Sequence, residues 1–173
     1  MKITTIEELF QIHPTIRLDD KASGSLTRQY FYNCKKSRFL KNVLEIFDNN
    51  ITLKDEADFF WIAKSFLESS ARKNIVTILN IFQHIECKSG ENFNHIAFNI
   101  KFHGTPENIL LITEIFKEVK NRDGWDFAHI SIGFYMWNAM KNLETILQEC
   151  RKNINWRGCD FHNIAKTLNG KKL

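Results

Sequence analysis

The sequence predicts an all-α protein, an α-solenoid of 34-residue helix–turn–helix repeats, and two observations lead to this prediction. First, four kinds of residue recur at that spacing, and a fixed period of this size is the signature of stacked structural repeats. Second, the chain holds 15 Phe but only two Pro and seven Gly among its 173 residues, which favours helices with large apolar faces. The recurring residues are Phe59, Phe93, Phe127 and Phe161; Ile62, Ile96, Ile130 and Ile164; Gly90, Gly124 and Gly158; and Asn74, Asn108 and Asn142.

The period divides the chain into two parts. Residues 1–25 are predicted to form a short helix over 4–12, which Pro14 ends, and a polar linker over 14–25. Residues 26–173 are predicted as the repeat domain. Its units are a degenerate one over 26–57 with helices at 26–35 and 37–49, full units over 58–91, 92–125 and 126–159, and a half-unit cap over 160–173. The alternative is that the chain is the front part of a longer array.

Each full unit is expected to begin with a capped first helix. Asp58, Asn92, Asp126 and Asp160 precede the Phe column, and such side chains accept hydrogen bonds from the first-turn amides as N-caps. Phe, Ile three residues on, a small residue and a further apolar residue form the buried stripe of that helix. The second helix carries its own apolar stripe, and the repeated Gly is expected in the left-handed turn that follows it.

The units resemble those of the tetratricopeptide-type α-solenoid superfamily over about Asp58–Leu173. Phe127, Ile130, Ser131 and Phe134 match the large–large–small–large stripe of that family's first helix. The second helix departs from the family's pattern of small residues, with Ile75, Ile109 and Leu143 in one column and Phe82, Phe116 and Cys150 in another. The five-residue segments Phe93–Ala97 and Phe161–Ala165 are also similar to octotricopeptide-type repeats, and that similarity implies RNA binding.

Candidate ligand-binding residues lie between the core positions of the first helices, which in helical-repeat arrays commonly line the concave face. Their types vary from unit to unit while the core columns stay constant. This variation is expected of a recognition surface and also of an unconstrained one. The groove candidates are Trp61, His95, His129 and Asn163 in one column; Ser65 and Asn99 in a second, which Gly133 and Thr167 complete; and Lys64, Phe98, Ile132 and Lys166 in a third.

The Asn column (Asn74, Asn108 and Asn142) opens the second helices. The favoured interpretation is a structural ladder whose side chains bond the carbonyls of the preceding turn. The alternative is a ladder that holds the backbone of an extended ligand. Basic residues gather in the turns and at the ends of the second helices, as the helix dipole favours, and they would suit phosphate contacts if they aligned along one edge.

The sequence shows no catalytic residues, metal site or cofactor motif. G-x-S-x-G, Walker and H-E-x-x-H patterns are all missing. His95 and His129 are not expected to share a metal ion, because packed helices lie about 8–10 Å apart while zinc ligands sit about 2 Å from the ion. The four cysteines form no C-x-x-C pair. Because Cys150 occupies the column that Phe82 and Phe116 fill, it is interpreted as a small core residue.

The first hypothesis for function is therefore a non-catalytic module that binds a protein or peptide on the first-helix groove. The net charge of +4 is small, and the pI of about 8.9 is below that of many dedicated nucleic-acid domains. An RNA-binding helical-repeat protein is the alternative, and a bacterial effector-like protein of unrelated activity is the second alternative. Since neither a signal peptide nor an apolar run of about 18–20 residues is apparent, we expect a cytoplasmic protein with no membrane partner.

Overall fold

The computed structural model describes residues 5–12, 23–52, 54–69, 71–100 and 105–170, and every regular element within these ranges is a helix. The prediction of an all-α protein is confirmed. The helices are α1 (Ile6–Ile12), α2 (Ser23–Lys36), α3 (Leu40–Asn50), α4 (Glu56–Glu68), α5 (Ala71–Phe82), α6 (Gly90–Ile100), α7 (Pro106–Glu118), α8 (Gly124–Trp137), the 3₁₀-helix η1 (Ala139–Asn142), α9 (Leu143–Arg151) and α10 (Gly158–Asn169).

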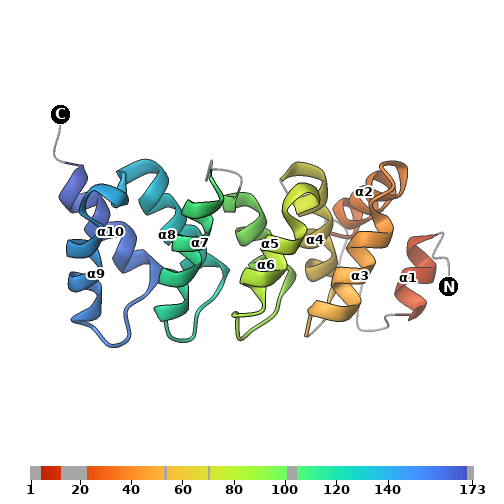
Figure 1. The fold of residues 1–173 in the computed structure, drawn as a ribbon. Coiled ribbons are helices and arrows are strands. Elements are labelled where there is room, and N and C mark those ends of the chain that lie inside the picture. The colour runs from red at the N-terminus through yellow and green to blue at the C-terminus, as the bar shows by residue number, and fades with distance from the viewer. Residues whose placement is uncertain (1–4, 13–22, 53, 70, 101–104, 171–173) are drawn as a thin grey trace.

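The helices follow one another in a row, with α1 at one end of the molecule and α10 at the other (Figure 1). Two sets of helices differ in their contacts. The first helices of the predicted units, α2, α4, α6, α8 and α10, each pack against the next. The second helices, α3, α5, α7 and α9, pack mainly against the first helix that follows them in the chain. The first helices therefore form a continuous layer against which the second helices pack.

The core lies between these two sets of helices. The four Phe side chains of the period have no exposed surface, and neither do Ile62, Ile96 and Ile130. The fourth Ile, Ile164, is partly buried and packs against the core. Leu168, on the same helix, is 41% exposed. Since α10 is the last described helix, no described helix follows it to cover these two side chains.

Pairs of phenylalanine rings join each second helix to the next first helix. Their centroids lie 5.9, 5.7 and 5.7 Å apart with interplanar angles of 80°, 85° and 89°, for Phe47–Phe59, Phe82–Phe93 and Phe116–Phe127 respectively. This edge-to-face arrangement suits the ring quadrupoles. Cys150, at the next position of the same column, is also buried, in agreement with its interpretation as a core residue.

The first helices begin earlier than predicted. The N-caps of α4 and α8 are Asp55 and Asp123, and the predicted caps Asp58 and Asp126 are the third helical residues, with which they form capping boxes. In α8 the Asp126 amide donates to Asp123 Oδ1 at 3.0 Å, and the Asp123 amide donates to Asp126 Oδ2 at 3.1 Å. The prediction of N-caps at 58 and 126 is wrong. Both members of each box are acidic, so the sequence is compatible with an N-cap at either position, and the structure has the earlier one. The prediction is also wrong at positions 92 and 160, since α6 begins at residue 90 and α10 at residue 158.

The repeated glycines are also placed differently from the prediction. Gly90, Gly124 and Gly158 are the first residues of α6, α8 and α10, and none of them has a positive φ. Each glycine instead lies against the backbone of the preceding first helix. A Cβ on Gly124 would stand 2.6 Å from the Asn92 carbonyl oxygen, and one on Gly158 would stand 2.3 Å from that of Asp126. Close approach, rather than a left-handed turn, requires these glycines.

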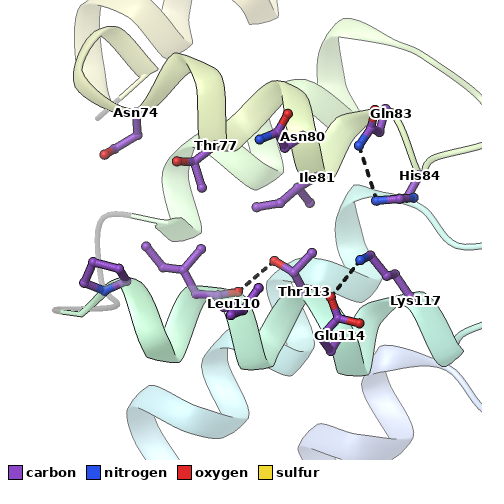
Figure 2. A pocket seen from close by; sticks show the side chains of 12 residues that line it. Asn74, Thr77, Asn80, Ile81, Gln83, His84, Leu110, Thr113, Glu114 and Lys117 are labelled. Atoms are coloured by element: carbon purple, nitrogen blue, oxygen red, sulfur yellow. Dashed lines mark hydrogen bonds and ion pairs between the residues drawn. The ribbon is translucent and has the colours of Figure 1, made fainter.

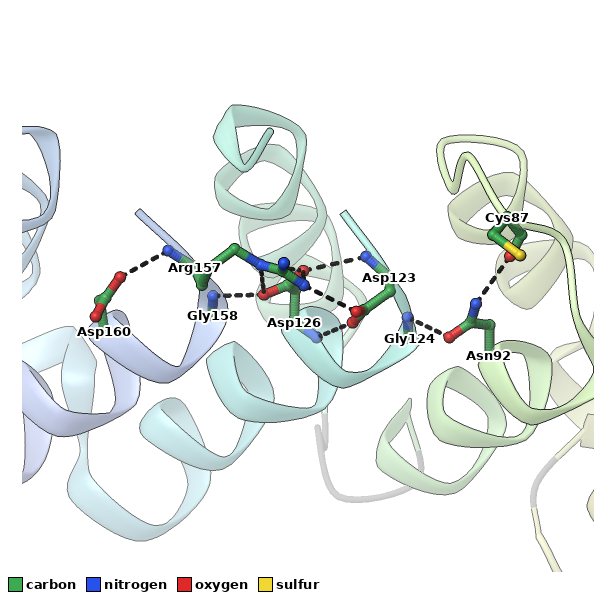
Figure 3. A network of polar contacts seen from close by, with 8 residues as sticks. All are labelled: Cys87, Asn92, Asp123, Gly124, Asp126, Arg157, Gly158 and Asp160. Carbon is green, nitrogen blue, oxygen red and sulfur yellow. Dashed lines mark hydrogen bonds and ion pairs between the residues drawn. The ribbon is translucent and has the colours of Figure 1, made fainter. Parts of the chain in front are cut away.

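A hydrogen bond accompanies each close approach, and Figure 3 shows those of Gly124 and Gly158. The Gly90 amide donates to Asp58 Oδ1, the Gly124 amide to Asn92 Oδ1 at 2.9 Å and the Gly158 amide to Asp126 Oδ1 at 2.7 Å. The Asp/Asn column thus satisfies an orphan amide at the start of the next first helix. We call this recurring contact the glycine staple.

An arginine reinforces the last staple. Arg157 Nε donates to Asp126 Oδ1 at 2.9 Å, and its terminal nitrogen donates to Asp123 Oδ2 at 2.8 Å (Figure 3). Because Asp126 is almost fully buried, the guanidinium partner compensates a charge that is removed from water. The same carboxylates raise the pKa of Arg157, chiefly through the hydrogen bond with Asp126.

The N-terminal region agrees with the prediction in part. The short helix α1 begins at Ile6, and α3 begins at Leu40 rather than at residue 37. The predicted linker over 14–25 falls mostly on residues 13–22, which lie outside the described residues. Its last part is wrong, because α2 already begins at Ser23.

Candidate functional site

The candidate site is the surface of α4, α6, α8 and α10 that faces away from the buried stripes, and we call it the first-helix face. Positions spaced by three and four residues line up on this face because they share one side of a helix. None of its side chains is fully buried. The residues of the face are Ala57, Trp61 and Lys64 on α4; Glu91, His95 and Phe98 on α6; Trp125, His129, Ile132 and Met136 on α8; and Asn163 and Lys166 on α10.

A chain of aromatic and imidazole rings crosses this face from α6 to α10. The His95 ring lies 3.9 Å from Trp125 between centroids, and Trp125 lies 6.0 Å from His129. His129 in turn lies 5.6 Å from His162, which is 6.2 Å from Trp137. We call these five residues the ring chain. It joins three first helices into one surface on which flat side chains follow one another.

Two lysines flank the ring chain at its two sides. Lys64 Nζ lies 4.9 Å from the centroid of Trp61 on α4, and Lys166 Nζ lies 5.6 Å from that of Trp137. Both distances are within the range of cation–π attraction. The ammonium groups are therefore held over rings, and α6 and α8 contribute no Lys or Arg to the first-helix face.

Two imidazoles of the ring chain carry little charge at neutral pH. Burial lowers the pKa of His95, an effect that Glu91 and Asp123 oppose and His129 reinforces. Burial likewise lowers the pKa of His162, with His129 and Lys166 acting in the same direction. Because the ordinary value for histidine is about 6.5, both rings are mainly neutral at pH 7. A neutral imidazole offers one donor and one acceptor nitrogen.

Several ring nitrogens of this chain are buried without a hydrogen-bond partner among the described residues: His95 Nε2, His129 Nδ1, His162 Nδ1 and Trp137 Nε1. Glu91 Oε1 lies 3.7 Å from His95 Nε2, which is too long for a hydrogen bond. Buried polar atoms in native structures are almost always paired. These four atoms are exceptions to that pattern, and because they are buried they are not exposed to a ligand in this structure.

The second column of predicted groove residues serves the helices themselves. Ser65 Oγ donates to the Trp61 carbonyl at 2.8 Å, and Asn99 Nδ2 donates to the His95 carbonyl at 2.8 Å. Thr167 Oγ1 does the same to Asn163 at 2.9 Å. Each of these bonds runs to the carbonyl four residues earlier, so the polar side chain is already hydrogen-bonded within its own helix. Ser65 is fully buried, so its prediction as a groove residue is wrong.

The three residues of the Asn column lie in different environments. Asn74 has non-helical dihedrals inside α5. Asn108 is the third residue of α7, where its backbone amide donates to Oγ1 of the N-cap Thr105 at 3.3 Å. Asn142 ends η1, and its side chain donates to Asn169 Oδ1 at 2.5 Å. The one side-chain hydrogen bond described for this column thus reaches α10 rather than a carbonyl of the preceding turn.

Three members of the ring chain were not among the predicted site residues. Trp125 is the second helical residue of α8, a position outside the helix as the sequence was interpreted. His162 precedes by one position the predicted groove residue Asn163 on α10, and it lies beside α8. Trp137 is the last residue of α8. The signal for Trp125 was the capping box, because an acid at 123 and another at 126 indicate a helix that begins at 124.

The described residues contain no group of three His, Cys, Asp or Glu side chains placed to hold a metal ion. Burial raises the pKa of Cys34 and of Cys150 to about 12, so these thiols remain protonated and poorly nucleophilic. Within the described ranges, no helix has the length and apolar character that crossing a membrane requires.

Comparison with known proteins adds no relative: no protein-family model, no curated protein and no solved structure matches the chain.

Proposed function

We propose that the protein is a non-catalytic interaction module, an α-solenoid of 34-residue helix pairs that binds an extended segment of another protein on its first-helix face. The recurrence of the glycine staple at three successive first helices supports the repeat architecture. The recurrence of the Phe–Phe contact at three successive layers supports it as well. Stacked units of this kind create extended binding surfaces.

The ring chain is the observation that carries the proposed function. Aromatic side chains supply large contact area at low entropic cost, and they are enriched in protein-binding surfaces. Trp125 is 51% exposed and Met136 is 59% exposed, so apolar surface is available for a partner.

The charges of the face favour a polypeptide over RNA. Binding to a nucleic acid draws its affinity largely from Lys and Arg on phosphates, but the face has only Lys64 and Lys166, each placed over an aromatic ring. Glu91 lies exposed on the same face, and its carboxylate would repel phosphates. The neutral imidazoles of His95 and His162 add no compensating charge.

The test is a peptide selection followed by direct binding. Random 12-residue peptides displayed on phage are selected against the immobilised full chain, and enriched peptides are synthesised with a fluorescein label for anisotropy titration. Trp125→Ala should weaken binding at least about tenfold, since a buried interface aromatic often contributes more than about 2 kcal/mol. Val76→Ala, an exposed apolar change on α5, is the matched control and should leave affinity unchanged.

A parallel titration uses labelled single-stranded RNA of mixed sequence at low and high salt. Micromolar RNA binding that weakens steeply with salt, and that the His95→Ala/His129→Ala variant abolishes, would replace the peptide proposal by RNA recognition. Failure to enrich any peptide whose binding depends on Trp125 would equally overturn it.

A further inference from the structure

A second cleft lies on the other layer of the molecule, between the second helices α5 and α7 (Figure 2). Its volume is about 540 Å³, within the range of ligand-binding pockets. From α5 and the turn after it come Asn80 and Gln83, and from α7 come Leu110 and Thr113. Figure 2 shows the lining side chains on the two helices that border the cleft, with the Gln83 amide directed at His84. We call this cleft the α5–α7 groove.

The packing explains why the groove exists. The glycine staple brings α6 and α8 into backbone contact at their starts, since the amide of Gly124 bonds the Asn92 side chain directly. The second helices have no such contact with each other and pack instead on the first helices. Phe82 and Phe116 fill the space beneath α5 and α7. A layer of tightly packed first helices thus leaves a layer of second helices with spaces between them.

The lining of the groove is rich in neutral polar groups over a buried floor. Ile81 and Thr113 are buried and form this floor. The Thr113 hydroxyl donates to the Ile109 carbonyl at 2.7 Å, and its oxygen still has lone pairs free to accept. The side-chain amides of Asn74, Asn80 and Gln83 lie along the α5 side. An amide side chain carries both donors and an acceptor, which are the groups that a peptide backbone requires in return.

The charges within the groove cancel. Lys117 Nζ pairs with Glu114 Oε1 at 2.7 Å at one end of the groove (Figure 2). His84 lies at the same end, and burial lowers its pKa, with Lys117 and Arg122 acting in the same direction and Glu114 opposing them. Its ring is therefore mainly neutral at pH 7. A neutral lining disfavours phosphates and nucleic acids, and the described residues of the lining include no Phe, Tyr or Trp ring against which a sugar could stack.

The length of the groove sets the size of its ligand. The lining on α7 runs from Pro106 to Lys117, which corresponds to about 16 Å at the rise of an α-helix. An extended chain advances about 3.4 Å per residue, so the groove accommodates roughly five residues. An open channel of this length suits a continuing polypeptide better than a compact small molecule.

We propose that the α5–α7 groove is a second binding site, which takes an extended peptide segment of about five residues through amide and hydroxyl contacts to its backbone. The occupant is a neutral segment of another polypeptide. This inference is independent of the proposed function, because the groove lies on the second helices and shares no residue with the first-helix face.

The experiment separates the two sites. The bait is the full chain with Trp125→Ala and His129→Ala, which removes rings of the first-helix face, and the probe is a phage library of random seven-residue peptides. Enriched peptides are labelled and titrated against wild type, Asn80→Trp and Lys73→Trp. Asn80 is an exposed groove residue whose enlargement fills the cleft, and Lys73 is an exposed residue of α5 that does not line it.

Asn80→Trp should weaken peptide binding at least about tenfold, while Lys73→Trp leaves it unchanged. Asn80→Ala combined with Thr77→Ala provides a variant without added bulk, and it should also weaken binding. The inference is overturned if no peptide is enriched on this bait, or if enriched peptides bind Asn80→Trp and Lys73→Trp equally. Because the bait lacks two rings of the first-helix face, failure of the proposed function leaves this result unaffected.

Discussion

At the scale of single residues, the glycines show how one position serves packing rather than backbone conformation. Gly90, Gly124 and Gly158 all have φ values that any residue adopts. What excludes a side chain is the backbone of the preceding first helix, which lies less than 3 Å from each missing Cβ. Real Cβ atoms do not approach backbone so closely, so an added methyl must push two helices apart.

We therefore expect Gly158→Ala to destabilise the protein by about 1–3 kcal/mol, as overpacking in a close contact does. A glycine at an unconstrained helical position would respond in the opposite direction, because alanine favours helix. Urea unfolding monitored by circular dichroism measures the change. Cys159→Ala, at the exposed neighbouring residue, is the control and should alter stability by less than about 0.5 kcal/mol. Equal or greater stability of Gly158→Ala would contradict the close contact.

The period predicts that these glycines share a role, but it cannot identify that role. The turn after one helix and the start of the next helix lie only two or three residues apart in the sequence, so a Gly in this region is compatible with either role. Which role applies depends on how close the Gly lies to another part of the chain, and residue spacing alone does not reveal that distance. Similarly, Ser65 occupies a polar position between core columns, yet it is fully buried and bonds a carbonyl of its own helix.

At the scale of helices, the boundaries determine which residues belong to the candidate site. An acid at the N-cap and an acid at the third helical residue are both favourable, so a sequence with acids at 123 and 126 is compatible with two starts. The structure shows the earlier start for α8. This difference adds Trp125 to the helical face, where it bridges His95 and His129. The predicted core, by contrast, depends on spacing alone, and its Phe column is buried at all four positions.

The phenylalanine contacts between helices make a testable statement about the first helices. Phe127 has no exposed surface and meets Phe116 of α7 edge to face at 5.7 Å. Phe127→Ala should therefore cost about 3–5 kcal/mol in chemical unfolding, from lost burial and the cavity left behind. Met136→Ala, on the exposed side of the same helix, should change stability by less than about 0.5 kcal/mol. A loss below about 1 kcal/mol for Phe127→Ala would show that this column is not the core.

At the scale of the whole molecule, the ring chain belongs to no single helix. His95, Trp125 and His162 come from three successive first helices, and only the packing of those helices places them in contact. The sequence predicts His95 and His129 as members of one column. It does not predict that rings from other columns fill the space between them, because that depends on the distance and rotation between neighbouring units.

The protonation of these rings connects the candidate site to the stability of the entire chain. Folding lowers the pKa of His95 and of His162, chiefly by burial, so the unfolded chain binds protons more readily than the folded one. The free energy of unfolding is then at its full value above the unfolded pKa of about 6.5 and decreases as the pH falls through the folded values. His84 contributes in the same direction.

We expect urea unfolding to show lower stability at pH 5.5 than at pH 7.5, and a smaller loss in the His95→Gln/His162→Gln variant. Part of the decrease in the free energy of unfolding remains in that variant, because His84 is still present and its pKa is also lowered on folding. Burial raises the pKa of Asp58, so its protonation favours the folded state; since Asp58 is present in both proteins, its effect cancels in their difference. Equal pH dependence in both proteins would show that the two imidazoles are not desolvated on folding, and the argument from neutral His95 and His162 rings for a peptide over RNA would lose its physical basis.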